Sequence, residues 1–390
     1  MLKSFKYRIS PTKAQAELIN KHIGSSRFVY NLALETKTMA YAGNQINLSC
    51  FDLIKQLPDL KKECTWLKEI NSQSLQAPIR NLDNAFTRFY KGQGNFPKYK
   101  SKRRGKQSFH IPQNVIVENG KLIIPKFKEG IDIVLHRETK GVIKSATISR
   151  TSTGKYFVSI LCDTKEEIPT KASITESTTI GIDLGIKDFA ITSKGEVFEN
   201  PKYLRKAQSK LKYVQRKYSK HKGKRTKKKL AKLHEDVVNK RKDFLHKVST
   251  KLIRENQTIA LETLAVKNIL KNHNLAQSIS DASWSTFVSM LEYKAEWYGK
   301  NILRIGRFAP SSKTCSCGVI NKDLKLSDRE WTCKSCGITH DRDILAACNI
   351  KSFALKNILS GTDRKNQDEL PTLVGVLTPE AQPIASGVGG

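Results

Sequence analysis

The sequence has no run of about 18 apolar residues, the length that a transmembrane helix needs, so we expect no membrane partner. Its first residues also lack the apolar core of a secretory signal, which predicts a cytoplasmic protein. Acidic residues are few, because 36 Asp and Glu stand against 69 Lys and Arg and leave a net charge of +33. This excess goes far beyond what solubility requires and indicates a polyanionic partner, most simply nucleic acid.

The eight cysteines also lack the regular spacing of a disulfide framework, since four of them stand alone in the sequence. In a reducing compartment, clustered cysteines indicate a metal site, and the other four do cluster: Cys315, Cys317, Cys333 and Cys336. Hydrophobic residues make up 38% of the 390, which is enough for real cores, and the length predicts two or three domains.

The first part of the chain predicts one strand followed by helices. Residues 2–9 alternate as a strand does, and Ser10 and Pro11 then suit the N-cap and first position of a helix. We expect helices over residues 11–23 and 25–42.

A longer helix is expected over residues 72–91, with its apolar side chains on one stripe. Gln76 and Arg80 lie off this stripe, either on a solvated face or as nucleic-acid contacts. The loop that follows, residues 93–107, interleaves aromatic rings with Lys98, Lys100, Arg103 and Arg104. Such runs are usually solvated, but they are also how single strands and RNA are held.

Residues 108–164 alternate with period two and contain turn signals at Asn119-Gly120 and Thr153-Gly154. We expect these strands to pair with the strand at residues 2–9 in a small barrel that the helical segment interrupts. The polar residues 165–178 are predicted to form a linker.

A strand is also predicted where apolar side chains alternate with Gly181, Asp183 and Gly185. One face of this strand is buried, and the two glycines leave space around the carboxylate on the other face. A lone Asp at a strand end is ordinarily a turn former or a cap, so only partners elsewhere in the chain would give Asp183 a chemical role.

Two other carboxylates occupy comparable places. Glu262 ends the apolar run 258–261, which is too short for a helix and predicts a buried strand. Asp343 lies in the first turn of a helix begun near Asp341 and shares a face with that helix's apolar stripe. An Asp in a first turn ordinarily serves the helix dipole.

Between these carboxylates the pattern predicts a hairpin over residues 189–198 and then two antiparallel helices. The tip between the helices is strongly basic and includes Lys222, Lys224 and Arg225. An exposed coiled-coil arm explains the apolar stripes but not the single sign of charge, so nucleic-acid contact remains a second interpretation. The order of elements predicts an α/β layer arrangement with ligands at the carboxyl ends of its strands.

Together, Asp183, Glu262 and Asp343 predict a metal site. Three unpaired carboxylates at one sheet edge would repel one another, and divalent metal relieves that repulsion. Two Mg²⁺ ions about 3.5 to 4 Å apart would activate water and stabilise the leaving oxygen in phosphodiester cleavage.

The sequences around these three carboxylates resemble the three RuvC signatures of the TnpB family, the transposon-encoded ancestors of type V CRISPR nucleases. The matching segments are residues 180–185, 261–262 and 341–347. Further segments resemble the family at residues 7–12, 27–31, 96–102 and 291–294. The resemblance covers nearly everything up to about residue 358.

The resemblance implies an α/β RuvC-like RNase H fold nuclease domain, joined to an N-terminal wedge-type β-barrel with a helical insertion and to a zinc-ribbon-like insertion. A guide RNA from the transposon end would pair with double-stranded target DNA beside a short flanking motif, and the single RuvC site would cut it. The host would be bacterial or archaeal, with the protein at the nucleoid. The implied parts are the barrel at 1–10 and 93–170, the helical recognition insertion at 11–92, the nuclease domain at 171–309 and 341–358, and the ribbon at 310–340.

By matching motifs, Asp183, Glu262 and Asp343 would be the catalytic Mg²⁺ ligands, the four clustered cysteines would bind Zn²⁺, and Gln76 would approach the flanking motif. Two features depart from the family pattern. The first knuckle, Cys315-Ser316-Cys317, is one residue short, which predicts a loss of zinc geometry. His340 is an alternative ligand, which its place beside the third catalytic motif disfavours. Leu345 also replaces the usual Asn, which predicts weaker cleavage.

Two alternatives stay open at this point. One is an RNA-guided DNA-binding protein without useful cleavage, similar to a repressor, and the other is a DNA transposase that acts by strand transfer. Residues 359–390 show no helical or strand period and are expected to be a disordered tail.

Overall fold

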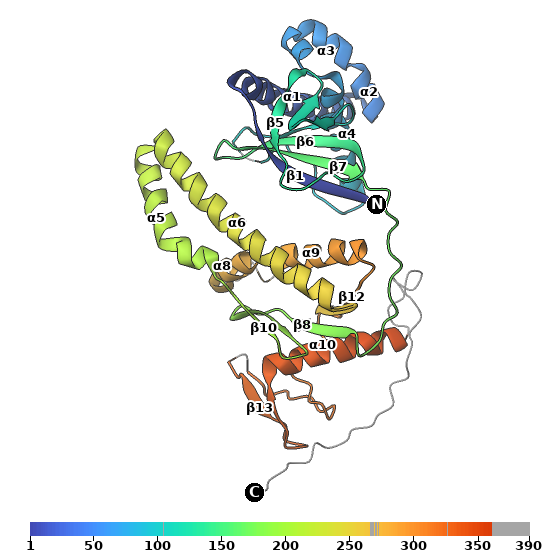
Figure 1. Cartoon of the computed structure of the whole chain (residues 1–390), viewed down its shortest axis with the longest axis vertical. Helices are drawn as coiled ribbons and strands as arrows, with labels where there is room; N and C mark the ends of the chain where they lie inside the picture. The colour runs from blue at the N-terminus through green and yellow to red at the C-terminus, as the bar shows by residue number, and fades with distance from the viewer. Residues whose placement is uncertain (104, 266–268, 270, 272, 326, 361–390) are drawn as a thin grey trace. The chain divides into compact units, whose positions relative to one another are not determined.

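The computed structural model describes residues 1–103, 105–265, 269, 271, 273–325 and 327–360. The chain divides into two compact units, Met1–Glu167 and Ile168–Gly390, which are described separately (Figure 1). The finer division into barrel, helical insertion, nuclease domain and ribbon stays a prediction, and nearly all of the predicted tail lies outside the described residues. Among the described helices, none combines the length and the apolar character that crossing a membrane requires.

Unit 1 contains an antiparallel sheet of seven strands, in the order β2-β6-β7-β1-β5-β4-β3. The central strand β1 pairs with both β5 and β7, which confirms that the first strand joins strands that follow the helices. The order is open, so a closed barrel stays a prediction. The strands are β1 Leu2–Ser10, β2 Gln107–Ile111, β3 Ile116–Glu118, β4 Lys121–Ile124, β5 Phe127–Val134, β6 Val142–Arg150 and β7 Tyr156–Asp163.

The two turns predicted in this sheet are confirmed. Asn119 and Gly120 both have positive φ, 49° and 70°, as a two-residue hairpin turn between β3 and β4 requires. Gly154, with a φ of 87°, lies in the turn between β6 and β7.

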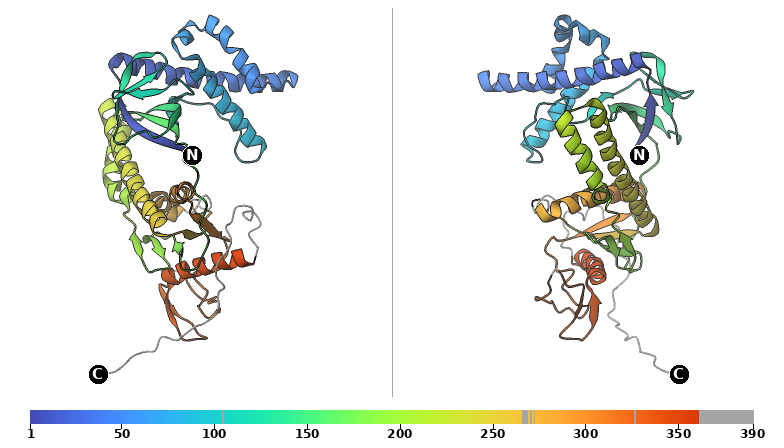
Figure 2. Two further views of the ribbon diagram at one scale, coloured as in Figure 1. Left: turned by 45° about the vertical axis from the view of Figure 1, so that its right-hand side comes forward. Right: turned by 90° about the vertical axis from the view of Figure 1, so that its left-hand side faces the viewer.

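The helices of unit 1 are α1 Lys13–Asn44, α2 Cys50–Lys55, α3 Leu57–Glu63, the 3₁₀ helix η1 Thr65–Glu69 and α4 Ser72–Tyr90. The expectation of two helices before residue 43 is wrong, since α1 runs straight through Gly24 (Figure 2). A single interior glycine costs only about 1 kcal/mol, and the packed face of a long helix offsets that. Ser10 is not the N-cap because it still pairs with Asp132 in the sheet, and Thr12 caps α1 together with Gln15.

Unit 2 is built on a five-stranded sheet in the order β10-β9-β8-β11-β12. Strands β8, β11 and β12 are parallel, and β9 and β10 continue the sheet in antiparallel fashion. The strands are β8 Thr179–Asp183, β9 Asp188–Thr192, β10 Val197–Glu199, β11 Thr258–Glu262 and β12 Asn301–Ile305. The predicted hairpin after Asp183 and both predicted buried strands are therefore confirmed.

Helices cover both faces of this sheet. One face packs its Ile and Leu side chains against α6 and α9, and the other face packs Ala260, Leu303 and Ile305 against α10 (Figure 1). The helices are α5 Tyr203–His221, α6 Lys224–Glu255, α8 His273–Ala282, α9 Trp284–Trp297 and α10 Arg342–Leu359. A small ribbon, β13 Glu330–Thr332 with β14 Thr339–Asp341, precedes α10. The layered α/β arrangement is thus confirmed.

Candidate active site and metal centre

Two of the candidate carboxylates lie side by side at one edge of the unit 2 sheet. Strands β8 and β11 are parallel, and Leu261 lies opposite Ile182, so the next residue on each strand is Glu262 or Asp183. Both strands end at that residue. Neighbouring parallel strands thus present two carboxylates at their carboxyl ends, where α/β sheets bind ligands.

The third carboxylate comes from the first turn of α10. Asp341 caps this helix, because its Oδ1 accepts hydrogen bonds from the amides of Asp343 and Ile344 at 3.0 and 2.9 Å. The apolar stripe predicted on α10 is buried against the sheet face that also contains Ala260. Asp343 therefore leads a helix whose position is set by core packing.

Gly181 has a different role from the one expected. A Cβ built on Gly181 would lie only 2.0 Å from the carbonyl oxygen of Ala347, one turn beyond Asp343 in α10. The glycine therefore admits the helix backbone rather than clearing space around the carboxylate. Asp183 lies two residues further along the same strand face, so this close approach brings Asp343 toward it.

All three carboxylates line one pocket, as predicted for a shared site. Burial, followed by the charges of Asp343 and Glu262, raises the pKa of Asp183 from 3.8 to about 7. Burial also raises the pKa of the Glu262 carboxyl. Burial raises a carboxyl pKa because it disfavours the ionised form, and neighbouring negative charges add to that penalty, which a divalent cation would remove.

Asp343 already has cationic partners. Its Oδ2 lies 2.8 Å from Nη1 of Arg329, and its Oδ1 lies 3.8 Å from Nε of Arg342. Among the described residues, ligand atoms close enough to share one ion occur only in the cysteine cluster. Metal binding by the carboxylates therefore requires these side chains to draw together.

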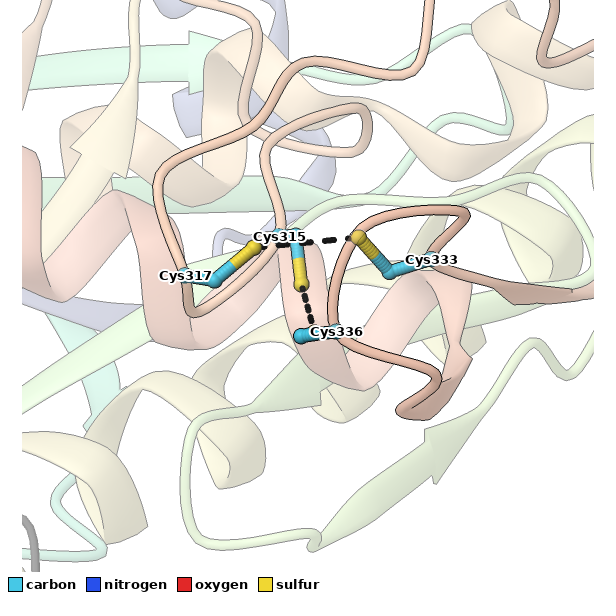
Figure 3. A group of neighbouring side chains, drawn as sticks. All are labelled: Cys315, Cys317, Cys333 and Cys336. Atoms are coloured by element: carbon cyan, nitrogen blue, oxygen red, sulfur yellow. Dashed lines mark hydrogen bonds between the residues drawn. The ribbon is translucent and has the colours of Figure 1, made fainter.

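The four clustered cysteines do meet (Figure 3). Their sulfur atoms all lie within 4.8 Å of one another, with Cys315 3.5 Å from Cys336 and Cys317 3.7 Å from Cys333. Four sulfurs at 2.3 Å from a tetrahedral Zn²⁺ would lie about 3.8 Å apart, so the cluster fits a structural zinc ion. Backbone amides of Cys336 and Ser335 lower the pKa of Cys333 to about 6, which favours the thiolate that zinc needs.

The short first knuckle keeps the hydrogen bonds of a full one. The amide of Gly318 donates to the carbonyl of Cys315 at 2.9 Å, just as Gly337 donates to Cys333 at 2.9 Å in the regular knuckle. Gly318 has a φ of 90°, a conformation open to glycine, and so closes the turn one residue early. The predicted loss of zinc geometry is therefore not seen in the arrangement of the four sulfurs.

His340 lies beside this cluster. Its Nε2 is 3.0 Å from Sγ of Cys315, a distance at which a ring N–H donates to a thiolate. Because all four cysteines are in place, the histidine suits a supporting donor to the zinc thiolates better than a substitute ligand.

Leu345 packs against the cysteine cluster and not into the carboxylate pocket. It is 7% exposed and shares a small core with Cys315, Trp331 and Cys333. The neighbouring Asp343 and Ala346 line the pocket instead. The two departures from the family pattern, the short knuckle and Leu345, are therefore neighbours in space.

Substitution of Leu345 by Asn should destabilise the protein instead of restoring cleavage. It removes a buried leucine, which costs about 2 kcal/mol or more, and places an amide among apolar groups and thiols. Thermal unfolding should show a Tm lower by about 4 to 8 °C, whereas Leu345→Met, which keeps the volume, should stay close to the parent. Faster cleavage by Leu345→Asn at an unchanged Tm would contradict this placement.

Purified protein should contain one zinc per chain, measured by elemental analysis. Removal of the ion by a chelator, or Cys333→Ser, should lower the Tm, because four thiolates at this spacing repel without a cation. Cys348→Ser, which alters a thiol of α10 outside the cluster, is the matched control and should keep both the zinc and the Tm. Zinc-free protein with an unchanged Tm would refute the site.

The predicted nucleic-acid contacts lie in separate places. Gln76 and Arg80 lie on α4, half-buried and exposed respectively, and Lys98 and Arg103 are exposed on the loop after α4. Arg104 lies outside the described residues. The basic tip of unit 2 is exposed and joins α5 to α6, with Lys222, Lys224 and Arg225.

Lys100 also has a structural partner. Its Nζ lies 3.7 Å from the centroid of the Tyr30 ring, and Asn31 forms two hydrogen bonds with the Lys100 backbone, at 2.7 and 2.9 Å. The basic loop is thereby fastened to α1.

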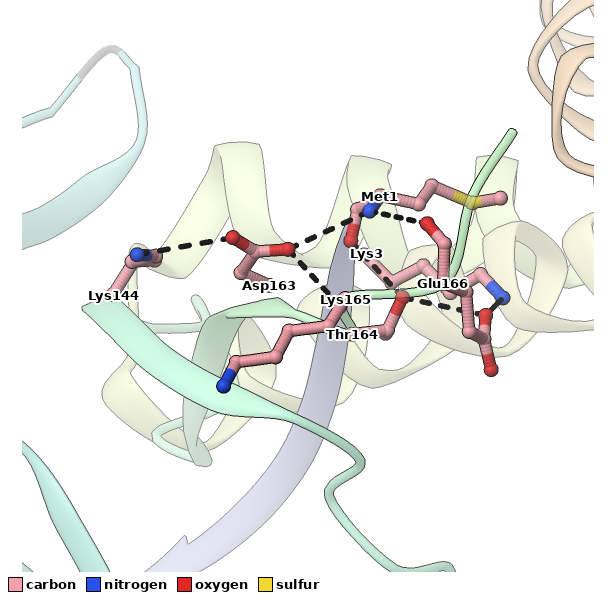
Figure 4. A network of polar contacts seen from close by, with 7 residues as sticks. All are labelled: Met1, Lys3, Lys144, Asp163, Thr164, Lys165 and Glu166. Carbon is pink, nitrogen blue, oxygen red and sulfur yellow. Dashed lines mark hydrogen bonds and ion pairs between the residues drawn. The ribbon is translucent and has the colours of Figure 1, made fainter.

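A further cluster of charged residues in unit 1 joins two strands of the sheet and is not a candidate functional site (Figure 4). The amino group of Met1 donates to the carbonyl of Glu166 at 2.8 Å, and Lys3 Nζ lies 2.7 Å from the Glu166 carboxylate. The amide of Thr164 donates to the carbonyl of Met1 at 2.9 Å. The start of β1 and the end of β7 are therefore fastened together.

Several residues of the carboxylate pocket were not predicted. Besides Arg329 and Arg342, the lining includes Lys187, Arg307, Phe308 and Lys313. Lys187 and Arg342 lie close in sequence to Asp183 and Asp343, whereas the loop after β12 brings Arg307, Phe308 and Lys313 to the pocket from a distant segment. The dense basic tracts elsewhere in the sequence did not predict these residues of the pocket lining.

Three family models match this chain. The model described as "Probable transposase" matches residues 159–273, the one described as "Cas12f1-like, TNB domain" matches residues 284–350, and the one described as "Helix-turn-helix domain" matches residues 1–45. The first two together include Asp183, Glu262, the cysteine cluster and Asp343.

Similar chains and a similar structure are also known. A protein of Streptomyces pristinaespiralis named "Putative RNA-guided DNA endonuclease" is 40% identical over 94% of this chain and 93% of its own. "Putative RNA-guided DNA endonuclease InsQ" of Escherichia coli K12 is 30% identical over 90% of this chain and 91% of its own. "TnpB-like protein L770" of Acanthamoeba polyphaga mimivirus is 25% identical over 91% of this chain and 74% of its own.

The structure of a Cas12f1–sgRNA–target DNA complex contains a chain that matches 87% of this one and 83% of its own, with a TM-score of 0.54 at 14% identity. At that identity the likeness concerns the fold, and it agrees with a RuvC-like nuclease fold in unit 2. With two relatives at 30% identity or more along nearly their whole lengths, and with the carboxylates and cysteines brought together as described, this chain belongs to the TnpB family.

Proposed function

We propose that the protein is an RNA-guided, Mg²⁺-dependent DNA endonuclease of a transposable element, which cuts target DNA beside a short flanking motif with one RuvC-type site. The observation that carries the proposal is the pocket that Asp183, Glu262 and Asp343 line together. The relatives named as RNA-guided DNA endonucleases and the Cas12f1 complex with guide RNA and target DNA support it.

The three carboxylates would hold Mg²⁺, which when bound supplies an activated water and stabilises the leaving oxygen. Asp183 must lose its proton to serve as a ligand, so its pKa of about 7 makes metal binding pH-dependent. The cations around the pocket, Arg329, Arg342 and Lys313, would attract the phosphodiester and neutralise it. The pocket thus combines metal ligands with phosphate-binding groups.

Base pairing with a guide RNA would supply the sequence specificity, and the protein would supply positive surface. The exposed basic tip with Lys222, Lys224 and Arg225 suits a duplex backbone, and the loop with Lys98 and Arg103 suits a single strand. A structural Zn²⁺ in the cysteine cluster would keep the ribbon folded beside α10. Such a protein would act in the cytoplasm, at the nucleoid of a bacterial or archaeal host.

The test begins with the RNA that copurifies with the protein. Its sequence should identify the guide segment, and a plasmid library with that target beside randomised flanking sequence should then be cut in Mg²⁺ for a subset of flanks. Intact plasmid under every flank would overturn the proposal.

A second candidate is an RNA-guided DNA-binding protein without useful cleavage. The observation that favours it is the ion pair between Arg329 and Asp343, which engages a metal ligand. It predicts guide-dependent binding of the same plasmids without cutting at any Mg²⁺ concentration. A transposase would instead yield joined DNA products without guide RNA, so one assay separates the three functions.

A further inference from the structure

Phe308 has an unusual place among the apolar side chains of this protein. At 87% exposure it is the most exposed large apolar side chain of the described residues, and it lines the pocket of Asp183 and Glu262. A phenylalanine that is open to water contributes nothing to the core. Its position in the lining of the carboxylate pocket places this open ring where a substrate would enter.

The backbone holds this ring at the edge of the pocket. Phe308 follows β12, the parallel neighbour of β11, so it leaves the sheet at the same edge as Glu262. A turn in which the amide of Ala309 donates to the carbonyl of Gly306 at 3.1 Å contains Phe308, and Thr263 Oγ1 donates to the carbonyl of Ile305 at 2.8 Å just before it. The ring thus projects from a hydrogen-bonded turn.

Positive charge surrounds the ring. The guanidinium carbon of Arg307 lies 5.2 Å from the centroid of Phe308, within reach of a cation–π interaction. Arg329 and Lys313 line the same pocket. An open aromatic face flanked by phosphate-binding cations is the combination with which proteins hold unpaired nucleotides, one base on the ring and the phosphate on the cation.

We propose that Phe308 is a stacking platform for one unpaired base of the DNA strand that enters the carboxylate pocket, with Arg307 at an adjoining phosphate. The inference rests on the proposed nuclease function and deepens it, since it assigns the pocket a single-stranded substrate. In a paired duplex both faces of each base are occupied by neighbouring bases, so stacking on Phe308 selects strands that guide pairing has displaced or opened.

The test measures binding and not cutting, in the RNA complex of an Asp183→Asn background. Fluorescence anisotropy of labelled single-stranded DNA measures binding by the parent and by Phe308→Ala, Phe308→Leu and Phe308→Trp. Loss of one stacked base predicts about 5- to 150-fold weaker binding for Phe308→Ala and Phe308→Leu, while Phe308→Trp should bind as the parent does. Leucine keeps the apolar character without the ring, so it separates stacking from general hydrophobic contact.

A strand with one abasic position provides the control within the substrate. When the missing base is the stacked one, Phe308→Ala and its parent should bind equally, because no base is left to lose. Tyr298→Ala removes another exposed aromatic of unit 2, one outside the pocket lining, and should leave binding unchanged.

Equal binding of intact strands by Phe308→Ala and its parent would overturn stacking, and so would a loss that no abasic position removes. Guided cutting of plasmid by the Phe308 protein is measured separately. If it persists while stacking fails, the proposed function stands and only this inference falls.

Discussion

Replacement of Asp183 by Asn should lower the rate of guided DNA cleavage at least about 100-fold and leave binding of guide and target nearly unchanged. Partners that merely orient metal ligands cost 10- to 100-fold when they are removed, so loss of a ligand should cost more. The Asp183 carboxylate accepts a hydrogen bond from the amide of Leu184, which the Asn amide oxygen can also accept, and Asp343 and Glu262 gain from losing a like charge. Single-turnover cleavage and filter binding measure the two quantities.

The same substitution should also stabilise the metal-free protein above neutral pH. The unfolded chain binds a proton at Asp183 only below about 3.8, whereas the folded chain keeps it up to about pH 7. Between these values the folded state binds more protons than the unfolded state, so the free energy of unfolding decreases as pH rises and levels off above 7.

Asparagine does not ionise, so the Tm difference between Asp183→Asn and the parent should grow from pH 5.5 to pH 8 and then stay constant. Groups common to both proteins, the zinc thiolates included, cancel in that difference. Mg²⁺ should raise the Tm of the parent at pH 8 and not that of the variant. A Tm difference that does not change with pH would mean that folding does not raise the pKa of Asp183.

Gly181→Ala should disrupt unit 2 although it adds a single methyl group. The new Cβ would lie 2.0 Å from the carbonyl of Ala347 and 2.8 Å from the amide of Lys351, both backbone atoms of α10. The helix must therefore retreat from β8, which opens the core around Ile350 and draws Asp343 away from Asp183. We expect a loss of about 3 kcal/mol or more, together with loss of cleavage.

Thermal unfolding and guided cleavage of Gly181→Ala test this, with Gly306→Ala as the matched control. Gly306 has no neighbouring atom within 4 Å of a new Cβ, so its substitution should change the Tm little. A Gly181→Ala protein with parental Tm and activity would show that α10 does not fix the position of the third carboxylate.

The local parts of the site could be predicted from the sequence. Burial of a strand or helix face produces a short repeat of apolar residues along the chain. Such repeats occur around Asp183 and on the helix of Asp343, and an apolar run precedes Glu262. Parallel strands that end in carboxylates then have few ways to be arranged, because ligands gather at their carboxyl ends. The hairpin turn at Asn119-Gly120 was predictable for a similar reason, since its φ angles depend on those residues alone.

Contacts between distant segments could not be predicted. Gly181 is required by the backbone of Ala347, and Arg329, just before β13, pairs with Asp343 of α10. The role of Leu345 also depended on which residues it contacts. Beside Cys315 the leucine is part of a small core, whereas beside the metal it would weaken the active site. The course of α1 through Gly24 likewise reflects tertiary packing overriding a weak local preference.

The most direct test of RNA guidance and of the carboxylate centre together is retargeting. The guide segment of the copurifying RNA is replaced by a new sequence, and two plasmids, matching the old or the new guide beside the permissive flank, are incubated with the complex in Mg²⁺. We predict that cutting follows the new guide, and that Asp183→Asn, Glu262→Gln and Asp343→Asn each bind the matched plasmid without cutting it. Cutting that ignores the guide, or that survives loss of any of these carboxylates, would contradict this prediction.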